Sequence, residues 1–217
     1  LVDAVRHQAA AAAEREFLSF VNGSSVSFSE FNDLTDRLGT ALCDLGVQPG
    51  DRILGLLTNS REFMLAMIAT HKVGAIFVPI NTELRGNFLE HQVHNSSPRI
   101  IVVDNGLIER FDAVDTSPTA IETVLRVNDG SDSTNSTPES LSGASHMPLE
   151  PLLETVPRIE ALATPVPEDV CTIMYTSGTT GPSKGVLMPQ GHCYLFALGT
   201  VAAMELTQDD RYFCCMP

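Results

Sequence analysis

The feature that most restricts the fold is a regular alternation of apolar runs and helical segments between residues 52 and 127. Apolar runs lie at 52–57, 75–78, 99–103 and 121–127, and helices are expected at about 60–73 and 84–95. Strands separated by helices of this length form βαβ units with right-handed crossovers, which place the helices on the faces of the sheet. The alternation therefore predicts an α/β fold with a mostly parallel sheet flanked by helices.

The part of the chain before residue 52 carries clear local signals. Residues 1–16 are rich in alanine, with apolar positions weakly spaced for a helix. Asn22-Gly23 lies between two short runs of strand-like sequence and predicts a hairpin. Ser27 and Glu30 have the spacing of a capping box, so a helix is expected to begin there and to end at Gly46.

Composition divides the chain into three stretches. Residues 1–127 are expected to form an α/β subdomain. Residues 128–148 contain few apolar residues and many Ser, Thr, Asn, Asp and Gly, so they cannot offset the entropy of ordering and are expected to be a flexible low-complexity insertion. Residues 149–217 are expected to belong to the same large domain as the first stretch.

The last stretch opens with a connector rich in proline, which leads to an apolar run at 170–175 that predicts a buried strand. A helix is expected at 190–204, with Tyr194, Leu198 and Val201 facing inward. His192 lies near its start and is expected to be a capping or partly buried histidine rather than a functional one. A final apolar run begins at Tyr212 and is expected to form a strand.

The charge balance excludes some classes of partner. The chain has 27 acidic and 13 basic residues, a net charge of −14, which repels nucleic acid and anionic membrane surfaces. No apolar run approaches the length of a membrane span. Hydrophobic content of 43% is that of a globular protein. The same negative field opposes ATP, so a nucleotide would need a locally positive loop.

The cysteines indicate a reducing compartment. The chain contains Cys43, Cys171, Cys193, Cys214 and Cys215. Their number is odd and no two of them have C-x-x-C or zinc-ligand spacing, so buried free thiols are expected. No signal peptide opens the sequence. A cytoplasmic protein without a structural metal is therefore expected.

The chemically distinctive segment is the loop from Thr176 to Gly185. It contains three glycines, five hydroxyl side chains and one lysine, with no acidic residue. Glycines allow successive backbone N–H groups to converge on an anion, while the hydroxyls and Lys184 add donors and positive charge. The composition of this loop suits a polyphosphate. The alternative is a solvated Gly/Ser/Thr surface loop.

A Walker A loop does not fit this segment. Counted from Gly178, that motif requires glycine before the lysine and Ser or Thr after it, but the chain has Ser183 and Gly185. The residues that follow Lys184, Gly-Val-Leu-Met-Pro, predict a strand rather than the helix that a Walker A loop opens. A P-loop NTPase is therefore not expected.

The order of residues from Tyr175 to Val186 resembles the phosphate-binding signature of the adenylate-forming (AMP-binding) enzyme superfamily, approximately [YF]-T-S-G-[ST]-T-G-x-P-K-G-V. One departure is the order Pro182-Ser183, since the family more often has proline directly before the lysine. The stretch from Lys72 to Asn81 resembles a second signature, [KR]-x-G-A-x-x-V-P-[IL]-[ND], and is interpreted as structural. The resemblance covers essentially the whole chain and implies the front part of the family's large N-terminal domain.

The resemblance implies an acid–CoA ligase of the acyl-CoA synthetase type, similar to fatty-acid or carnitine CoA ligases. Such an enzyme converts a small carboxylic acid and ATP into an acyl-adenylate and pyrophosphate, and then forms a thioester with coenzyme A. ATP, Mg²⁺ and coenzyme A are the implied co-substrates. The residues implied to cradle the phosphates are Thr176, Ser177, Gly178, Thr179, Thr180, Gly181 and Lys184. Thr179 or Thr180 is the best candidate to contact Mg-ATP.

No catalytic residue is assigned within the chain. Full-length members of the family continue beyond residue 217 with acid-binding segments and a C-terminal lysine, so the 217-residue chain alone is expected to be inactive. Two alternatives remain open at this point. One is an amino-acid-activating adenylation domain that loads a carrier protein, and the other is a non-catalytic α/β module that binds anions weakly.

Overall fold

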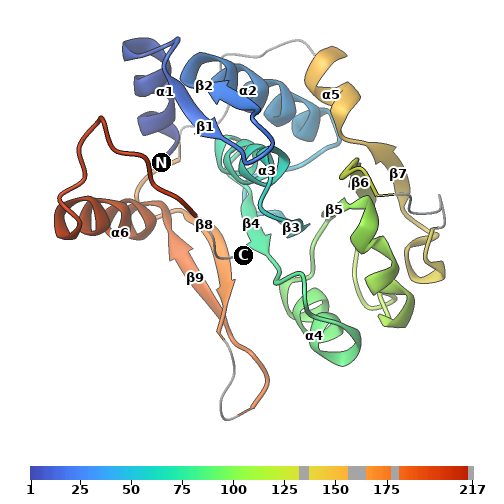
Figure 1. The fold of residues 1–217 in the computed structure, drawn as a ribbon. Helices are drawn as coiled ribbons and strands as arrows, with labels where there is room; N and C mark the ends of the chain where they lie inside the picture. Colours follow the sequence, from blue (N-terminus) through green and yellow to red (C-terminus); the bar gives the residue numbers. More distant parts are fainter. Residues whose placement is uncertain (132–136, 156–164, 177–180, 215–217) are drawn as a thin grey trace.

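The computed structural model describes residues 1–131, 137–155, 165–176 and 181–214. Its centre is a seven-stranded sheet with the order β7-β6-β5-β3-β4-β8-β9 (Figure 1). The strands are β3 (Arg52–Leu56), β4 (Ile76–Pro79), β5 (Ile100–Asp104), β6 (Thr123–Val127), β7 (Ser145–Pro148), β8 (Val170–Tyr175) and β9 (Gly185–Pro189). Neighbouring strands pair in parallel except β8 and β9, which are antiparallel. The expected α/β fold with a mostly parallel sheet is confirmed.

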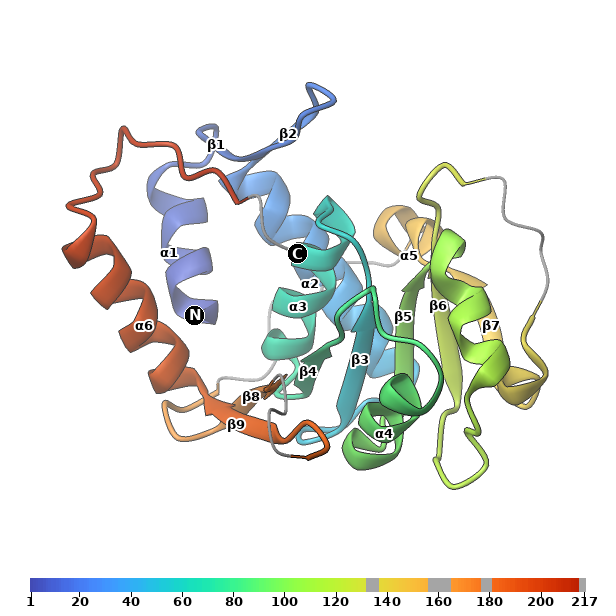
Figure 2. The ribbon, with the colours of Figure 1, turned by 60° about the horizontal axis from the view of Figure 1, so that its bottom comes forward.

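Helices cover both faces of the sheet (Figure 2). On one face lie α2 (Phe28–Asp44), α3 (Arg61–Lys72) and α5 (Glu150–Thr155); on the other lie α4 (Gly86–Ser96) and the 3-10 helix η1 (Asn105–Ala113). Successive strand residues point to opposite faces, so Ile53 packs with Leu38 and Leu65, while Leu54 packs with Leu89. Two apolar cores therefore hold the sheet, one on each side.

The N-terminal segment follows its local signals. Helix α1 (Val2–Ala11) is followed by the antiparallel pair β1 (Glu16–Ser19) and β2 (Ser25–Ser27), as the hairpin signal predicts. The Ser27 hydroxyl accepts a hydrogen bond from the backbone N–H of Glu30 at 3.2 Å, which caps α2. After α2, Gly46 takes a φ of +81°, as expected for a helix stop.

The expectation of a flexible insertion over 128–148 is wrong for residues 139–148. A 3-10 turn, η2 (Glu139–Leu141), is followed by β7, whose backbone pairs in parallel with β6. The Leu141 side chain is 2% exposed in the core beside η1. Composition misled here because backbone pairing and one buried leucine order the segment with little apolar content. Residues 132–136 lie outside the described part of the chain.

The connector before the phosphate-binding signature also contains structure that its prolines did not predict, since α5 packs on α2 with Leu153 buried. Beyond it, β8 pairs with β4 and β9 follows β8. The stretches 1–127 and 149–217 therefore contribute to one continuous sheet.

Helix α6 (Gln190–Ala203) forms as expected, but its apolar side chains do not face inward. Tyr194, Leu198 and Val201 are each about half exposed, at 45%, 46% and 46%. Figure 1 shows α6 beyond β9, away from the helices that cover the sheet. His192 is exposed and does not cap the helix, so the expectation of a capping or partly buried histidine is wrong; its ring is tilted against that of Phe196, with 4.6 Å between ring centroids. An apolar helix thus has little to bury against within the described part of the protein.

The strand expected from Tyr212 onward is wrong for residues 212–214, where Tyr212 and Phe213 are exposed. The expectation of buried free thiols is confirmed in part. The four described cysteines are free, but only Cys171 is buried, since Cys43 and Cys214 are exposed and Cys193 is half-buried; Cys215 lies outside the described residues. Within the described ranges, no helix combines the length and apolar character needed to cross a bilayer.

Candidate phosphate-binding site

The candidate site begins where β8 ends. Because β8 runs parallel to β4, its last residue, Tyr175, lies at the edge of the sheet where the carboxyl ends of the parallel strands meet. Ligands of open α/β sheets bind at this edge. The expected strand at 170–175 is confirmed, but only Cys171, Thr172 and Ile173 are buried, and Met174 is 48% exposed. The loop that follows starts from the edge where a ligand is expected.

The two ends of the loop are held together by two hydrogen bonds, one between backbone groups and one from the backbone to a side chain. The N–H of Thr176 donates to the carbonyl of Lys184 at 3.0 Å, and the N–H of Lys184 donates to the Thr176 hydroxyl at 3.3 Å. Thr176, Gly181 and Lys184 are all exposed. The structure therefore brings Thr176 and Lys184 together at the base of the loop, while Ser177, Gly178, Thr179 and Thr180 lie outside the described residues.

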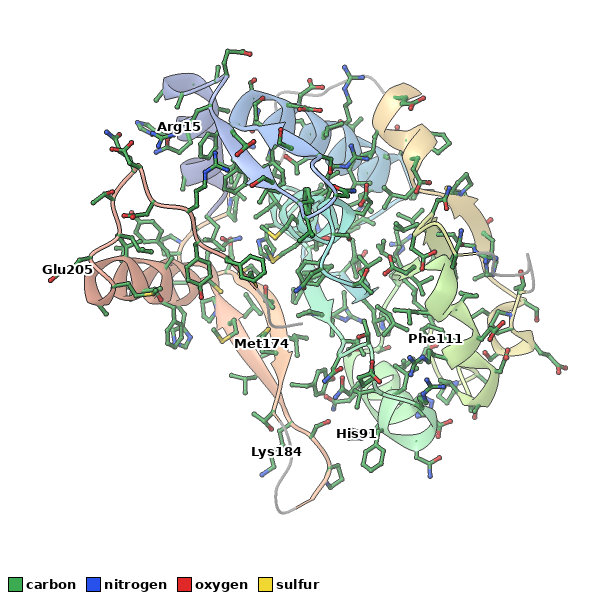
Figure 3. The ribbon with its side chains drawn as sticks, viewed as in Figure 1. Arg15, His91, Phe111, Met174, Lys184 and Glu205 are labelled. Carbon is green, nitrogen blue, oxygen red and sulfur yellow. The ribbon has the colours of Figure 1, made fainter. Side chains whose placement is uncertain are left out.

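The segment after Lys184 is the strand β9, which continues into α6, and no helix opens at the lysine. The strand expected from Gly-Val-Leu-Met-Pro is confirmed. Gly185 is required at its start, because a Cβ atom there would lie 2.8 Å from Cγ2 of Ile173 on β8. Figure 3 shows the result: β8 and β9 form a hairpin, and Lys184 lies near its loop end.

Helix α4 contacts this hairpin through three polar side chains that the sequence analysis did not identify. His91 and Gln92 both contact Ser183, the residue before Lys184. The phenol of Tyr175 donates to Oδ1 of Asn95 at 2.7 Å, and burial raises the pKa of this phenol. The sequence signal for these contacts is the i, i+4 spacing of His91 and Asn95, which places these two residues on one helix face.

Beneath the hairpin, α3 supplies a buried histidine. Nε2 of His71 lies 3.1 Å from the hydroxyl of Thr172 on β8, and burial lowers the pKa of His71 to about 4. The neighbouring thiol of Cys171 lies 3.8 Å from that of Cys193. Burial, together with Cys193, raises the pKa of Cys171 to about 12. These groups are neutral near pH 7, so they support the strand rather than bind an anion.

The second family signature has a structural role, as its interpretation predicts. Lys72 is fully buried, and its ammonium donates to Asp36, Asn32 and Thr35 on α2 at 2.7, 2.8 and 2.8 Å. This network joins α3 to α2 on the sheet face opposite α4. Over the described ranges, no group of three or more His, Cys, Asp or Glu residues is arranged to hold a metal ion.

Comparison with known protein families identifies the family of the whole chain. A family model described as AMP-binding enzyme matches residues 5–217. The chain belongs to the AMP-binding enzyme family. This assignment agrees with the resemblance of the Tyr175–Val186 and Lys72–Asn81 signatures. It also agrees with the position of the loop at the carboxyl edge of the parallel strands.

Individual relatives in the family differ in their substrates. The chain is 27% identical over 196 residues to a feruloyl-CoA synthase from Amycolatopsis sp, covering 90% of this chain and 34% of that protein. It is 29% identical over 190 residues to surfactin synthase subunit 1 of Bacillus subtilis, covering 88% of this chain and 5% of that protein. The chain therefore spans about a third of the feruloyl-CoA synthase and far less of the surfactin synthase.

Solved structures show the same fold. A long-chain-fatty-acid CoA ligase described as putative, from Rhodopseudomonas palustris, superimposes with a TM-score of 0.79 at 22% identity, covering 96% of this chain and 49% of that one. ATP-bound MatB from the same organism superimposes with a TM-score of 0.73 at 24% identity, covering 91% of this chain and 36% of that one.

Proposed function

We propose that this chain is the front part of the large N-terminal domain of an acid–CoA ligase and contributes the loop that holds the phosphates of ATP. The reaction joins a small carboxylic acid to AMP with release of pyrophosphate, and the acyl group then passes to the thiol of coenzyme A. The observation that carries the proposal is the loop base, where Thr176 and Lys184 meet at the carboxyl edge of the sheet.

The chemistry of adenylation explains why such a loop is needed. As the carboxylate attacks the α-phosphate, negative charge builds up on the departing pyrophosphate and must be stabilised by preorganised donors. In this role, the exposed Lys184 ammonium contacts the phosphates as a point charge. Thr176, Ser177, Thr179 and Thr180 add hydroxyl donors, and Gly178 and Gly181 allow the backbone to approach closely. Mg²⁺ would arrive with the nucleotide and neutralise part of its charge.

The acid substrate is proposed only as a class. The relatives include a feruloyl-CoA synthase, which is named for an aromatic acid, and a CoA ligase of known structure that is named for long-chain fatty acids. Ferulic acid and long-chain fatty acids are both carboxylic acids, so the proposal covers aliphatic and aromatic carboxylic acids, fatty acids among them. A reaction that consumes ATP and coenzyme A fits a cytoplasmic location.

The experiment is an ATP–pyrophosphate exchange assay on the full-length protein, with a panel of aliphatic acids, aromatic acids and amino acids. Exchange that depends on an aliphatic or aromatic acid, followed by CoA-thioester formation detected by mass spectrometry, supports the proposal. Exchange without any thioester on addition of coenzyme A contradicts it. The 217-residue chain assayed alone is expected to give no thioester, since the resemblance assigns the acid-binding segments to later residues.

A second candidate function is amino-acid activation for a carrier protein, favoured by the 29% identity to surfactin synthase subunit 1. It uses the same phosphate loop and the same first step. The same assay separates the two candidates: exchange stimulated by amino acids and absent with other carboxylic acids supports the second. A protein that shows no exchange with any acid or amino acid of the panel would instead be the non-catalytic α/β module.

A further inference from the structure

The loop end of the hairpin lies beyond the residue pair that sets its register in the sheet. The register between β4 and β8, both fully described, pairs Phe77 with Thr172 and no other residues. Strand β9 is the last strand of the sheet and pairs with β8. Toward the loop, Tyr175 and Ser183 therefore extend past the part of the hairpin that the sheet holds. Helix α4 packs against β9 and is the element in position to support this end of the hairpin.

Helix α4 supplies that support on both arms of the hairpin. On the returning arm, the His91 ring contacts the carbonyl of Ser183 at 2.8 Å and the Gln92 amide donates to its hydroxyl at 3.1 Å. On the outgoing arm, the phenol of Tyr175 donates to Asn95 at 2.7 Å. Ser183 is bonded to Lys184 in the chain, so the helix is one peptide unit away from the proposed phosphate ligand. Figure 3 labels His91 on α4 beside the loop that carries Lys184.

The contact with Ser183 also accounts for the unusual order of residues in the loop. The common family order has proline before the lysine, and proline offers no side-chain hydrogen bond. This chain has Pro182 followed by Ser183, and the serine hydroxyl accepts from Gln92, whose side chain is 5% exposed. The reversed order thus supplies an acceptor for a buried amide that needs one.

We propose that His91, Gln92 and Asn95 of α4 are positioning residues that hold the phosphate loop, with His91 and Gln92 acting through Ser183 on the location of Lys184. This inference deepens the proposed function and rests on it for its kinetic consequence. The contacts themselves can be tested without ATP. The structural claim and the kinetic claim therefore have separate readouts.

The central variant is His91→Ala, and the chain offers a matched control in His94→Ala. Both histidines lie on α4, both are half-buried, and both contact a backbone carbonyl, but His94 contacts Asp115 near η1 instead of the loop. Loss of one hydrogen bond to the loop should raise the KM for Mg-ATP about three- to tenfold. The KM for the acid should stay unchanged, and His91→Gln, which keeps an N–H donor, should restore part of the loss.

A second test concerns the hydrogen bond between the side chains of Gln92 and Ser183. Gln92→Ala and Ser183→Ala each break the same hydrogen bond, so the double variant should be no worse than the more damaging single variant. Ser183→Ala alone makes the smaller change and keeps the test usable if Gln92→Ala fails to fold. Fully additive effects on the KM for Mg-ATP would overturn the assignment of this pair.

The readout that needs no ATP is native-state cleavage by a lysine-specific protease, followed by mass spectrometry. The 217 residues contain two lysines: Lys72 is fully buried and Lys184 is exposed in the loop. His91→Ala should speed cleavage after Lys184 several-fold in the full-length protein, and His94→Ala should not. Equal cleavage rates in these two variants would overturn the proposal.

The outcomes distinguish the two inferences. A wild-type protein without nucleotide-dependent exchange, but with faster cleavage in His91→Ala, refutes the proposed function and supports the anchoring of the loop. A wild-type protein that uses ATP, with the two histidine variants alike in both cleavage and KM, refutes the anchoring and leaves the proposed function intact. Faster cleavage with an unchanged KM for Mg-ATP refutes the claim that α4 places Lys184 for the nucleotide.

Discussion

The ammonium of Lys72 lies 2.7 Å from a carboxylate oxygen of Asp36, and both side chains are buried between α3 and α2. Asn32 and Thr35 accept the remaining hydrogen bonds of the ammonium. A buried ion pair is costly to break from one side, because the partner is left as an uncompensated charge. This relationship gives the first prediction.

Asp36→Ala should lower the free energy of unfolding by about 3–5 kcal/mol, because Lys72 stays buried without its counter-charge. The double variant Lys72→Met/Asp36→Leu should lose much less, since both charges are removed and apolar volume is kept. Urea unfolding followed by circular dichroism measures both. A double variant less stable than Asp36→Ala would show that the pair has a net stabilising role that exceeds its desolvation cost.

The buried His71 should make the protein sensitive to acid. Its pKa in the folded protein is about 4, below the ordinary value near 6.5, so between these values the unfolded chain binds a proton that the folded chain does not. Stability should therefore fall as the pH drops from about 6.5 to about 4, by on the order of 3 kcal/mol from this residue. His71→Gln should flatten that part of the stability–pH curve, whatever its stability at pH 7. An unchanged slope would contradict the prediction.

Lys184→Ala in the full-length protein should weaken the use of Mg-ATP about ten- to hundredfold, the worth of a charge-assisted hydrogen bond to phosphate. Lys184→Arg should restore part of it, because the charge returns in a different geometry. Arg6→Ala on α1 removes the same charge far from the loop in sequence and serves as the control for net charge. Steady-state kinetics at varied Mg-ATP measure all three, and equal effects of Lys184→Ala and Arg6→Ala would contradict the role of this lysine.

Leu141→Ala should destabilise the protein by about 2–5 kcal/mol, the usual cost of truncating a buried leucine. The side chain is 2% exposed although it lies in a segment of polar composition. Val21→Ala, at a residue 96% exposed, should change stability by less than about 0.5 kcal/mol. Thermal or urea unfolding compares the two variants, and a loss below 1 kcal/mol for Leu141→Ala would mean that residues 139–148 contribute little to the fold.

Sequence reasoning succeeded where the physical signal is local. The Ser27–Glu30 cap, the Asn22-Gly23 hairpin and the strand at Val170–Tyr175 all depend on residues close together in the chain, and all are present. Local patterns could not give the strand order, because β8 joins β4 across the intervening strands and helices.

Most of what the sequence did not predict depends on contacts between residues that are far apart in the chain. The contact of His91 with Ser183 and that of Tyr175 with Asn95 each join distant parts of the chain, so no window of sequence contains both partners. Tyr194 and Leu198 have helical apolar spacing, but what such a face packs against is decided by the rest of the fold. Leu141 was hidden by the polar residues around it.

The narrow register between β4 and β8 also bears on the order of folding. Pairing Phe77 with Thr172 closes a long loop of chain. The chain loses conformational entropy on closing this loop before the contact between the two strands contributes any stabilising free energy. The hairpin should therefore dock late, after β3 to β6 have formed, and substitutions at Thr172 should change the unfolding rate more than the folding rate. By the same reasoning, the amides of β8 should lose their protection against hydrogen exchange before those of β3 and β5.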